Sequence, residues 1–236
     1  MPLGPHGVGA RIPRARFTSR AARFVAAALC VGVLALTLAG CQVGASFKYV
    51  SHRAPDGVDM YFKLPPNWNT FNTDQVIEAQ NGKLGPTQLK QISSGEWVES
   101  MSPEPRVTAK DSLGIGRSYP TAVVQSDELG ASQRDDLNFS AMRSLVLGTD
   151  PLTATSGFDV LNYSDFTLPG GIRGIKMIVD ITDTSPVVTY GQVTAVDAGT
   201  DWVFSVEVSC QASCWGANAS AITDLLNSWT LKEQSP

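Results

Sequence analysis

One histidine, His52, lies beyond residue 40, and it limits the acid–base chemistry that this part of the chain could perform. A Ser-His-Asp or Cys-His centre would have to use this side chain as its base, and no G-x-S-x-G motif is present to carry a nucleophilic serine. A single histidine also cannot form the zinc sites that need two or three. Because His52 stands in a polar stretch next to Arg53, we expect an exposed turn histidine without a catalytic role.

Four aspartates could instead supply paired carboxylates, which hydrolyse glycosidic bonds when two of them flank one substrate. Asp180 and Asp183 flank the end of one strand-like run, and Asp197 and Asp201 flank the next turn, so both pairs could share one end of the sheet. The alternative is that they are solvated turn residues, since aspartate favours turns by bonding to nearby backbone. We expect the turn role and no metal site, because the spacing is not that of an EF-hand loop.

Two tryptophans are candidates for a ligand surface. Trp68 and Trp97 lie in segments rich in Pro, Gly and Ser, where a large ring could be displayed. An aromatic face covers much apolar area with little loss of entropy, which suits a groove for a sugar or lipid. The alternative is that both rings pack beneath a loop. Trp202 and Trp229 occupy positions that fit a core.

Charge argues against one class of partner. Five arginines and no acidic residue precede residue 41, which leaves 13 basic against all 22 acidic residues beyond it, a net charge of −9. Binding to phosphates depends on clustered Lys and Arg, and no basic run follows residue 40. We therefore expect no nucleic-acid partner. The "GIG" at 114–116 lacks the third glycine and the preceding strand of a dinucleotide-binding loop, so no cofactor is expected.

The first 40 residues have the pattern of a secretory signal. The arginines precede an uncharged apolar run from Phe24 to Leu38, and the small residues Ala39 and Gly40 follow it. This run suits the apolar region of a signal peptide, but it is shorter than the roughly 20 residues that a membrane-spanning helix needs. The sequence therefore predicts an N-terminal segment that is removed.

The end of this segment, Leu38-Ala39-Gly40-Cys41, resembles the lipobox of bacterial lipoproteins. In that family the cysteine thiol receives a diacylglycerol, and a signal peptidase that recognises the preceding residues cuts just before it. The resemblance implies that 1–40 is a signal peptide, that Cys41 is lipidated, and that 41–46 is a short tether at the extracytoplasmic face of the cell membrane. Two acyl chains are enough for stable anchoring.

The remaining cysteines agree with export. Cys30 would be removed with the signal, which leaves Cys210 and Cys214 as a pair in the exported domain. An oxidising compartment favours a disulfide between them. A redox or metal pair is the alternative, but the C-x-x-C spacing and a nearby histidine are missing.

Residues 47–236 are expected to form one α+β domain. Two alternating runs around Ala-Pro-Asp-Gly predict a β-hairpin over 47–65. Ser132 and Gly148 are expected to begin and end one helix. Consecutive antiparallel pairing is the simplest topology for the strand-like runs between turn residues. The other predicted elements are a short helix at 73–79, strands at 117–126, 157–168, 172–182, 187–197 and 201–210, and a last helix at 217–231.

This order of elements, with the "FKLPPNW" entry and the "C…CW…SWTL" ending, resembles the LpqN-like lipoproteins of actinobacteria, which have a Mog1/PsbP-like α/β/α sandwich. The resemblance implies an antiparallel sheet between helices, and a non-enzymatic accessory role at the cell envelope, binding an envelope protein or a small ligand. It supplies no catalytic residue. The alternatives are a hydrolase with an unrecognised carboxylate site and a lipid or glycolipid carrier, which would need a sizeable apolar cavity.

Overall fold

The computed structural model describes residues 47–55, 57–81 and 97–233. These described residues belong to one compact unit. Leu38, Ala39, Gly40, Cys41 and the predicted tether lie outside the described residues. Within the described ranges, no helix has both the length and the apolar character needed to cross a bilayer.

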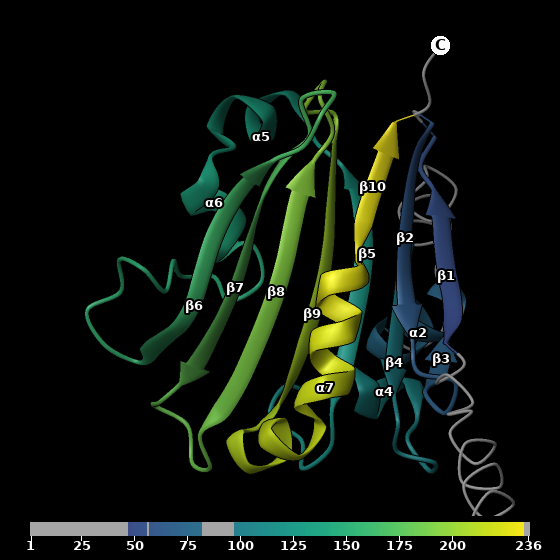
Figure 1. The fold of residues 1–236 in the computed structure, drawn as a ribbon, viewed down its shortest axis with the longest axis vertical. Helices are drawn as coiled ribbons and strands as arrows, with labels where there is room; N and C mark the ends of the chain where they lie inside the picture. The colour runs from purple at the N-terminus through teal and green to yellow at the C-terminus, as the bar shows by residue number, and fades with distance from the viewer. Residues whose placement is uncertain (1–46, 56, 82–96, 234–236) are drawn as a thin grey trace, which may run out of the picture. The chain divides into compact units, whose positions relative to one another are not determined.

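Two antiparallel sheets and several helices make up this unit (Figure 1). The larger sheet has seven strands in the order β3-β4-β5-β9-β8-β7-β6, and the smaller has three in the order β1-β2-β10. In chain order the elements are β1 (Lys48–Arg53), β2 (Val58–Leu64), β3 (Asn69–Phe71), α2 (Thr73–Asn81), β4 (Trp97–Ser102), α4 (Ala109–Ser112), β5 (Thr121–Glu128), α5 (Ala131–Asp136), α6 (Phe139–Ser144), β6 (Phe158–Thr167), β7 (Arg173–Ile181), β8 (Val188–Val196), β9 (Trp202–Gln211), α7 (Ala212–Ser228) and β10 (Thr230–Glu233).

The predicted meander is confirmed. Strands β6 to β9 pair consecutively and antiparallel. Turn residues set the ends of these hairpins: the backbone N–H of Gly171 donates to Leu168, and that of Thr200 donates to Asp197. Because side chains alternate between the two faces of a strand, β8 and β9 contribute to the hydrophobic clusters on both faces of the sheet.

One face of the large sheet is covered by α7 and the small sheet (Figure 1). Ile222, Leu225 and Leu226 of α7 pack on Phe204 and other residues of the sheet. Gly191 of β8 permits this close approach, because a Cβ there would lie 2.8 Å from Cη2 of Trp215 and 2.9 Å from Cδ1 of Leu226. The opposite face packs against α5, α6 and their connections, with Met142, Met177 and Tyr190 among its buried residues. The expected sandwich of helices around an antiparallel sheet is therefore present.

One predicted helix is divided in two. Residues 131–148 form α5 and α6 instead of a continuous helix, and α5 begins after Gly130 rather than at Ser132. Leu137 has an extended backbone, and the side chain of Asn138 accepts a hydrogen bond from the backbone N–H of Ala141, which starts α6. Asparagine favours this capping geometry over a helix interior.

Cys210 at the end of β9 is joined to Cys214 in the first turn of α7 by a disulfide, with the Cα atoms 5.9 Å apart. Cys210 is fully buried. Replacing both cysteines with serine is expected to lower the free energy of unfolding by about 2 kcal/mol, because the small loop closes only a short stretch of unfolded chain. Urea unfolding with and without a reducing agent measures this. A wild-type protein that reduction leaves unchanged would contradict the prediction.

Candidate functional site

The two tryptophans proposed for a ligand surface have different surroundings. Trp68 is a core residue, only 3% exposed, so it is not a surface ligand site. The backbone N–H of Trp68 donates to the carbonyl of Pro65 at 3.1 Å in a turn. The side chain is buried in the hydrophobic core between the two sheets. Trp97 is partly buried against the same core. The structure therefore does not bring Trp68 and Trp97 together on an open surface.

His52 is neither in a turn nor fully exposed, and that prediction is wrong. It lies in β1, and its ring stacks on that of Trp97 in β4, with the ring centroids 4.3 Å apart and the planes 4° from parallel. Its Nε2 atom is buried without a hydrogen-bond partner among the described residues. Burial lowers the pKa of His52. The stack links the small sheet to the large one.

The four aspartates lie at opposite ends of β8. Asp180 and Asp183 belong to the β7–β8 end, where Asp180 accepts a hydrogen bond from Thr189 at 2.6 Å. Asp197 and Asp201 belong to the β8–β9 turn, where Asp197 accepts the backbone N–H groups of Asp201 and Trp202. At about 3.3 Å per residue, the nine-residue strand between them separates the pairs by roughly 26 Å. They therefore form no common site, and the possibility that both pairs share one end of the sheet is wrong.

A cavity that sequence reasoning missed lies on the sheet face opposite α7. Its volume is about 170 Å³. Neighbouring positions on three strands form its floor, because Ser209 of β9 pairs with Tyr190 of β8 and with Thr121 of β5. Residues from α2, α4 and the segments after α4 and α6 form its walls. The lining residues are Gln80, Ser112, Leu113, Gly114, Ile115, Thr121, Val123, Val146, Tyr190, Glu207 and Ser209, and we call this the Glu207 cavity.

Glu207 is the ionisable acid of this cavity, and it is only 9% exposed. Burial raises its pKa to about 7, the nearby charge of Asp127 acts in the same direction, and hydrogen bonds from Ser205 and Tyr190 oppose the change. The Ser205 hydroxyl donates to Oε1 at 3.3 Å. Burial and the neighbouring Glu207 also raise the pKa of Tyr190 well above its usual value. At neutral pH the cavity therefore holds a carboxyl group that can gain or lose a proton.

Helix α6 is fixed beside this cavity by buried polar contacts. The Gln192 side chain in β8 donates to the backbone carbonyl of Met142 at 2.8 Å. Arg143 forms two hydrogen bonds to Asp150, both 2.7 Å long, with side-chain exposures of 11% and 7%. Ser140 donates to the same carboxylate at 2.6 Å. These contacts hold the start of the segment that carries Val146 into the cavity wall.

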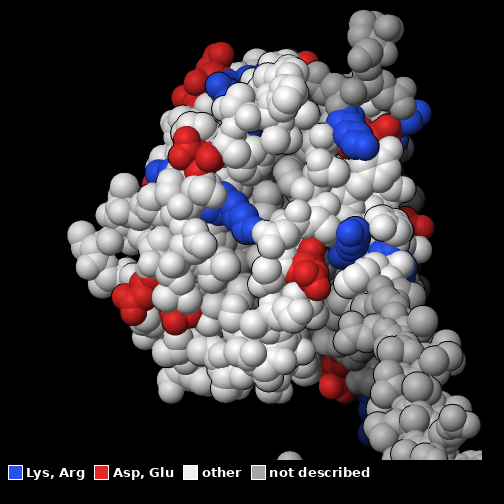
Figure 2. Space-filling view, in the orientation of Figure 1, with Lys and Arg blue, Asp and Glu red and all other residues white. Residues whose placement is uncertain are grey.

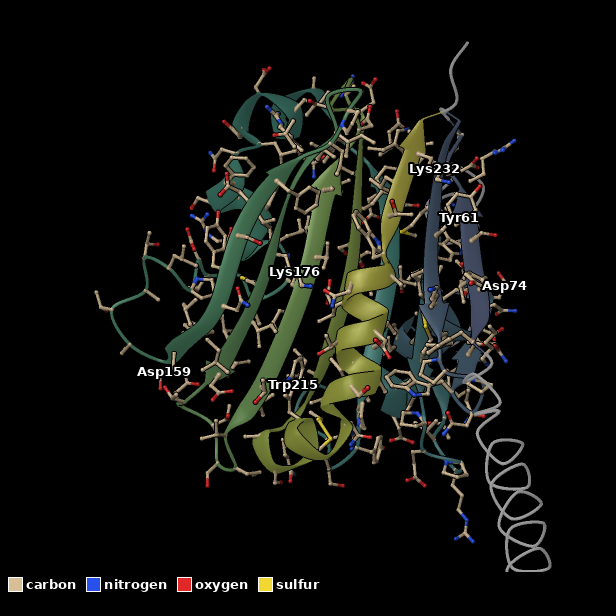
Figure 3. The ribbon with its side chains drawn as sticks, in the orientation of Figure 1. Tyr61, Asp74, Asp159, Lys176, Trp215 and Lys232 are labelled. Carbon is tan, nitrogen blue, oxygen red and sulfur yellow. A yellow bond between two sulfur atoms is a disulfide. The ribbon has the colours of Figure 1, made fainter. Side chains whose placement is uncertain are left out.

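The opposite face of the sheet carries a second, more open hollow beside α7. It has a volume of about 210 Å³ and is lined mainly by apolar residues, among them Phe166 and Trp229. Figure 3 shows Lys176 on this face next to α7, where its ammonium group contacts Asn227. Figure 2 shows the charged side chains of this face scattered among uncharged ones.

Both hollows are smaller than the roughly 300 Å³ at which pockets for drug-sized ligands begin, so neither is the sizeable cavity that a lipid carrier would need.

The Glu207 cavity has the character of a binding site for a small molecule. A carboxyl with a pKa near neutrality can transfer a proton at physiological pH. However, the other lining residues include no second carboxyl, histidine or thiol. Among the described residues, the cavity therefore lacks the paired carboxylates of glycoside hydrolysis and the histidine or thiol of a Ser-His or Cys-His centre.

No protein-family model matches this sequence, and no curated protein matches it. Several solved structures are similar to the chain, and three of them are described here. LpqN of Mycobacterium tuberculosis, described as involved in cell envelope biogenesis, is 14% identical over 79% of this chain and 91% of its own, with a TM-score of 0.44. Ran-binding protein Mog1p of Saccharomyces cerevisiae is 9% identical over 78% and 96%, with a TM-score of 0.40. The cyanobacterial PsbP of Synechocystis is 12% identical over 82% and 96%, with a TM-score of 0.41.

These similarities include the group that the sequence resembles, LpqN, and the Mog1 and PsbP folds. At identities of 9–14% and TM-scores of 0.40–0.44 they carry no argument about activity. Membership of the LpqN-like family stays a prediction, and the function is argued from the sequence and from the cavity.

Proposed function

We propose that this protein is a lipid-anchored, non-enzymatic binding protein at the extracytoplasmic face of the cell membrane, and that it holds a small ligand in the Glu207 cavity. The observation that carries the binding role is the pairing of a buried, titratable carboxyl with a small cavity whose described walls are largely apolar and include no second carboxyl, histidine or thiol. Pockets of this composition use a few polar groups to orient a ligand and apolar walls to bury it.

The sequence around Cys41 supports the location. An apolar run ends at Leu38-Ala39-Gly40, and strand β1 begins at Lys48, seven positions after Cys41. An extended chain spans at most about 3.5 Å per residue, so a lipid on Cys41 would hold β1 within about 25 Å of the membrane surface. A ligand or an envelope protein partner would be met at that distance.

Cys41→Ala is expected to abolish lipidation and cleavage, because alanine has no thiol to form the thioether. Intact-mass analysis of the membrane fraction should find residues 1–40 absent and a diacylglycerol present on the wild-type protein, and an unprocessed chain in the variant. Cys30→Ala, which changes a cysteine inside the predicted signal, is the matched control and should be processed normally. A Cys41→Ala protein with wild-type mass and processing would show that Cys41 is not the attachment point.

A further inference from the structure

We propose that the Glu207 cavity binds a small organic ammonium ion: a primary amine with a compact apolar body of about one six-membered ring. This inference rests on the proposed function in taking the cavity as the ligand site, and adds the chemical class of the ligand. It is argued from the hydrogen-bonding state of the lining groups, from the charges around Glu207 and from the size of the cavity.

The hydroxyl groups of the cavity already use their hydrogen atoms within the protein. Ser112 donates to the carbonyl of Ala109 at 2.7 Å, and Thr121 donates to that of Gly114 at 2.9 Å. The Ser209 and Thr121 hydroxyl oxygens lie 3.3 Å apart, and the Tyr190 hydroxyl donates to Oε1 of Gln192 at 3.4 Å. Because each hydroxyl has one hydrogen but two lone pairs, these groups offer mainly acceptors to a ligand. A ligand that fits them must therefore be rich in donors, and an ammonium group has three.

No cation compensates the Glu207 carboxylate among the described residues. The charged or titratable groups that act on it are Tyr190 of β8 and Asp127 of β5, and both are acids. The nearest walls contribute the amide of Gln80 and apolar side chains. The basic residues next to these walls are engaged elsewhere: Arg117 with Asp111 at 3.4 Å, and Arg143 with Asp150 and Tyr163. A buried carboxylate without a positive partner is unfavourable, and a bound ammonium would provide that partner.

The size and the walls of the cavity set the body of the ligand. Leu113, Ile115, Val123 and Val146 supply apolar surface around the acceptors. The volume of about 170 Å³ is close to that of an engineered apolar cavity of about 150 Å³ that holds benzene. Ile115 is 53% exposed and marks the side of the cavity that reaches solvent.

Binding of such a cation would be coupled to proton release. The Glu207 carboxyl has a pKa of about 7 without ligand, so below that pH an ammonium ion must displace the proton to pair with the carboxylate. The affinity should therefore rise by about 30-fold from pH 5.5 to pH 8 and level off above that. Nearly one proton should be released for each ligand bound at pH 5.5, and almost none at pH 8. A neutral ligand would show neither effect.

Isothermal titration calorimetry on the full chain in detergent, in two buffers with different heats of ionisation, tests this proposal. The probes are cyclohexylammonium and cyclohexanol, which differ in charge and donors but share the ring. We expect cyclohexylammonium to bind with the pH dependence given above and cyclohexanol to bind at least tenfold more weakly at pH 8. Glu207→Gln should abolish proton release and weaken the ammonium probe by at least tenfold at pH 8. Glu99→Gln, which changes a partly buried acid in β4, is the matched control and should leave both unchanged.

A second variant keeps the site itself testable. Val146→Phe should fill the cavity and block either probe, and thermal unfolding checks that both variants fold. Equal affinity for the two probes, or affinity for the ammonium that does not change with pH, would overturn the inference while leaving a small-ligand role intact. Failure of both probes to bind the wild-type protein would overturn the inference and the cavity as the ligand site, whereas an unlipidated Cys41 would overturn only the proposed anchoring.

Discussion

Asp150→Asn is expected to lower the free energy of unfolding by about 3 kcal/mol at pH 7, because it removes one partner of a buried ion pair and leaves the other without compensation. Asp150 accepts two hydrogen bonds from Arg143, one from Ser140 and one from the backbone N–H of Leu152. The pKa of Asp150 is lowered to about 2, and the hydrogen bonds from Arg143 are the largest cause. Chemical denaturation of wild type and variant at pH 7 measures the loss.

The pH dependence of the free energy of unfolding provides a second test of this prediction. A carboxyl whose pKa is lower in the folded state than its usual 3.8 stabilises the fold above that value, and the contribution disappears as the pH falls towards 2. The difference between wild type and Asp150→Asn should therefore shrink by about 2 kcal/mol between pH 5 and pH 2. Asp159→Asn, at an exposed position of β6, is the control and should change stability little. An equally small effect at both positions would contradict the role given to the Arg143–Asp150 pair.

Glu207→Gln is expected to have the opposite sign and to stabilise the protein by about 3 kcal/mol at pH 8. The pKa of Glu207 is raised to about 7 from 4.5, so between these values the folded state keeps a proton that the unfolded state has lost. Wild-type stability should therefore fall as the pH rises through this interval and stay level above pH 7. Glutamine does not titrate, so the variant lacks this decline. At pH 4 the free energies of unfolding of wild type and Glu207→Gln should differ little.

Denaturant unfolding of both proteins at half-unit steps from pH 4 to pH 8 measures the effect. Glu128→Gln, in which an exposed glutamate of the neighbouring β5 is changed, should run parallel to wild type across the whole range. A Glu207→Gln protein whose stability also runs parallel to wild type would mean that the buried carboxyl does not titrate in this interval.

Local patterns predicted the hairpins because both the alternation and the turn residues lie within one short stretch of sequence. The β1–β2 hairpin and the four strands of the meander are of this kind. Pairings between distant segments were not predictable in the same way. β5 lies beside β9, and β10 joins β2, although nothing in the composition of either strand specifies its neighbour. The residues that end one helix and begin another at 137–138 resemble ordinary surface positions until the capping contact of Asn138 is seen.

The Glu207 cavity could not be predicted from the sequence pattern of β9. Ser205, Glu207 and Ser209 alternate with apolar residues along β9, a pattern that usually places the polar side chains in solvent. Here α4, α6 and their connections cover that face, so the acid is buried. The neighbouring strand β8 has a similar pattern, because Tyr190, Gln192 and Thr194 occupy every second position. All three are buried. When helices cover both faces of a sheet, polar residues that share one face of two central strands indicate a buried polar site.

The pairing of β10 with β2 has a consequence for how the chain is made. Thr230 lies opposite Tyr61, and the indole Nε1 of Trp229 donates to the sulfur of Met60 at 3.1 Å across 169 positions of sequence. At roughly 5–20 residues per second, β2 emerges from the ribosome about 10–30 s before its third strand exists. During this interval one edge of β2 has no partner strand, and an unpaired edge of an apolar strand promotes aggregation. The small sheet can therefore be completed only after β10 has been synthesised, about 170 residues later than β2.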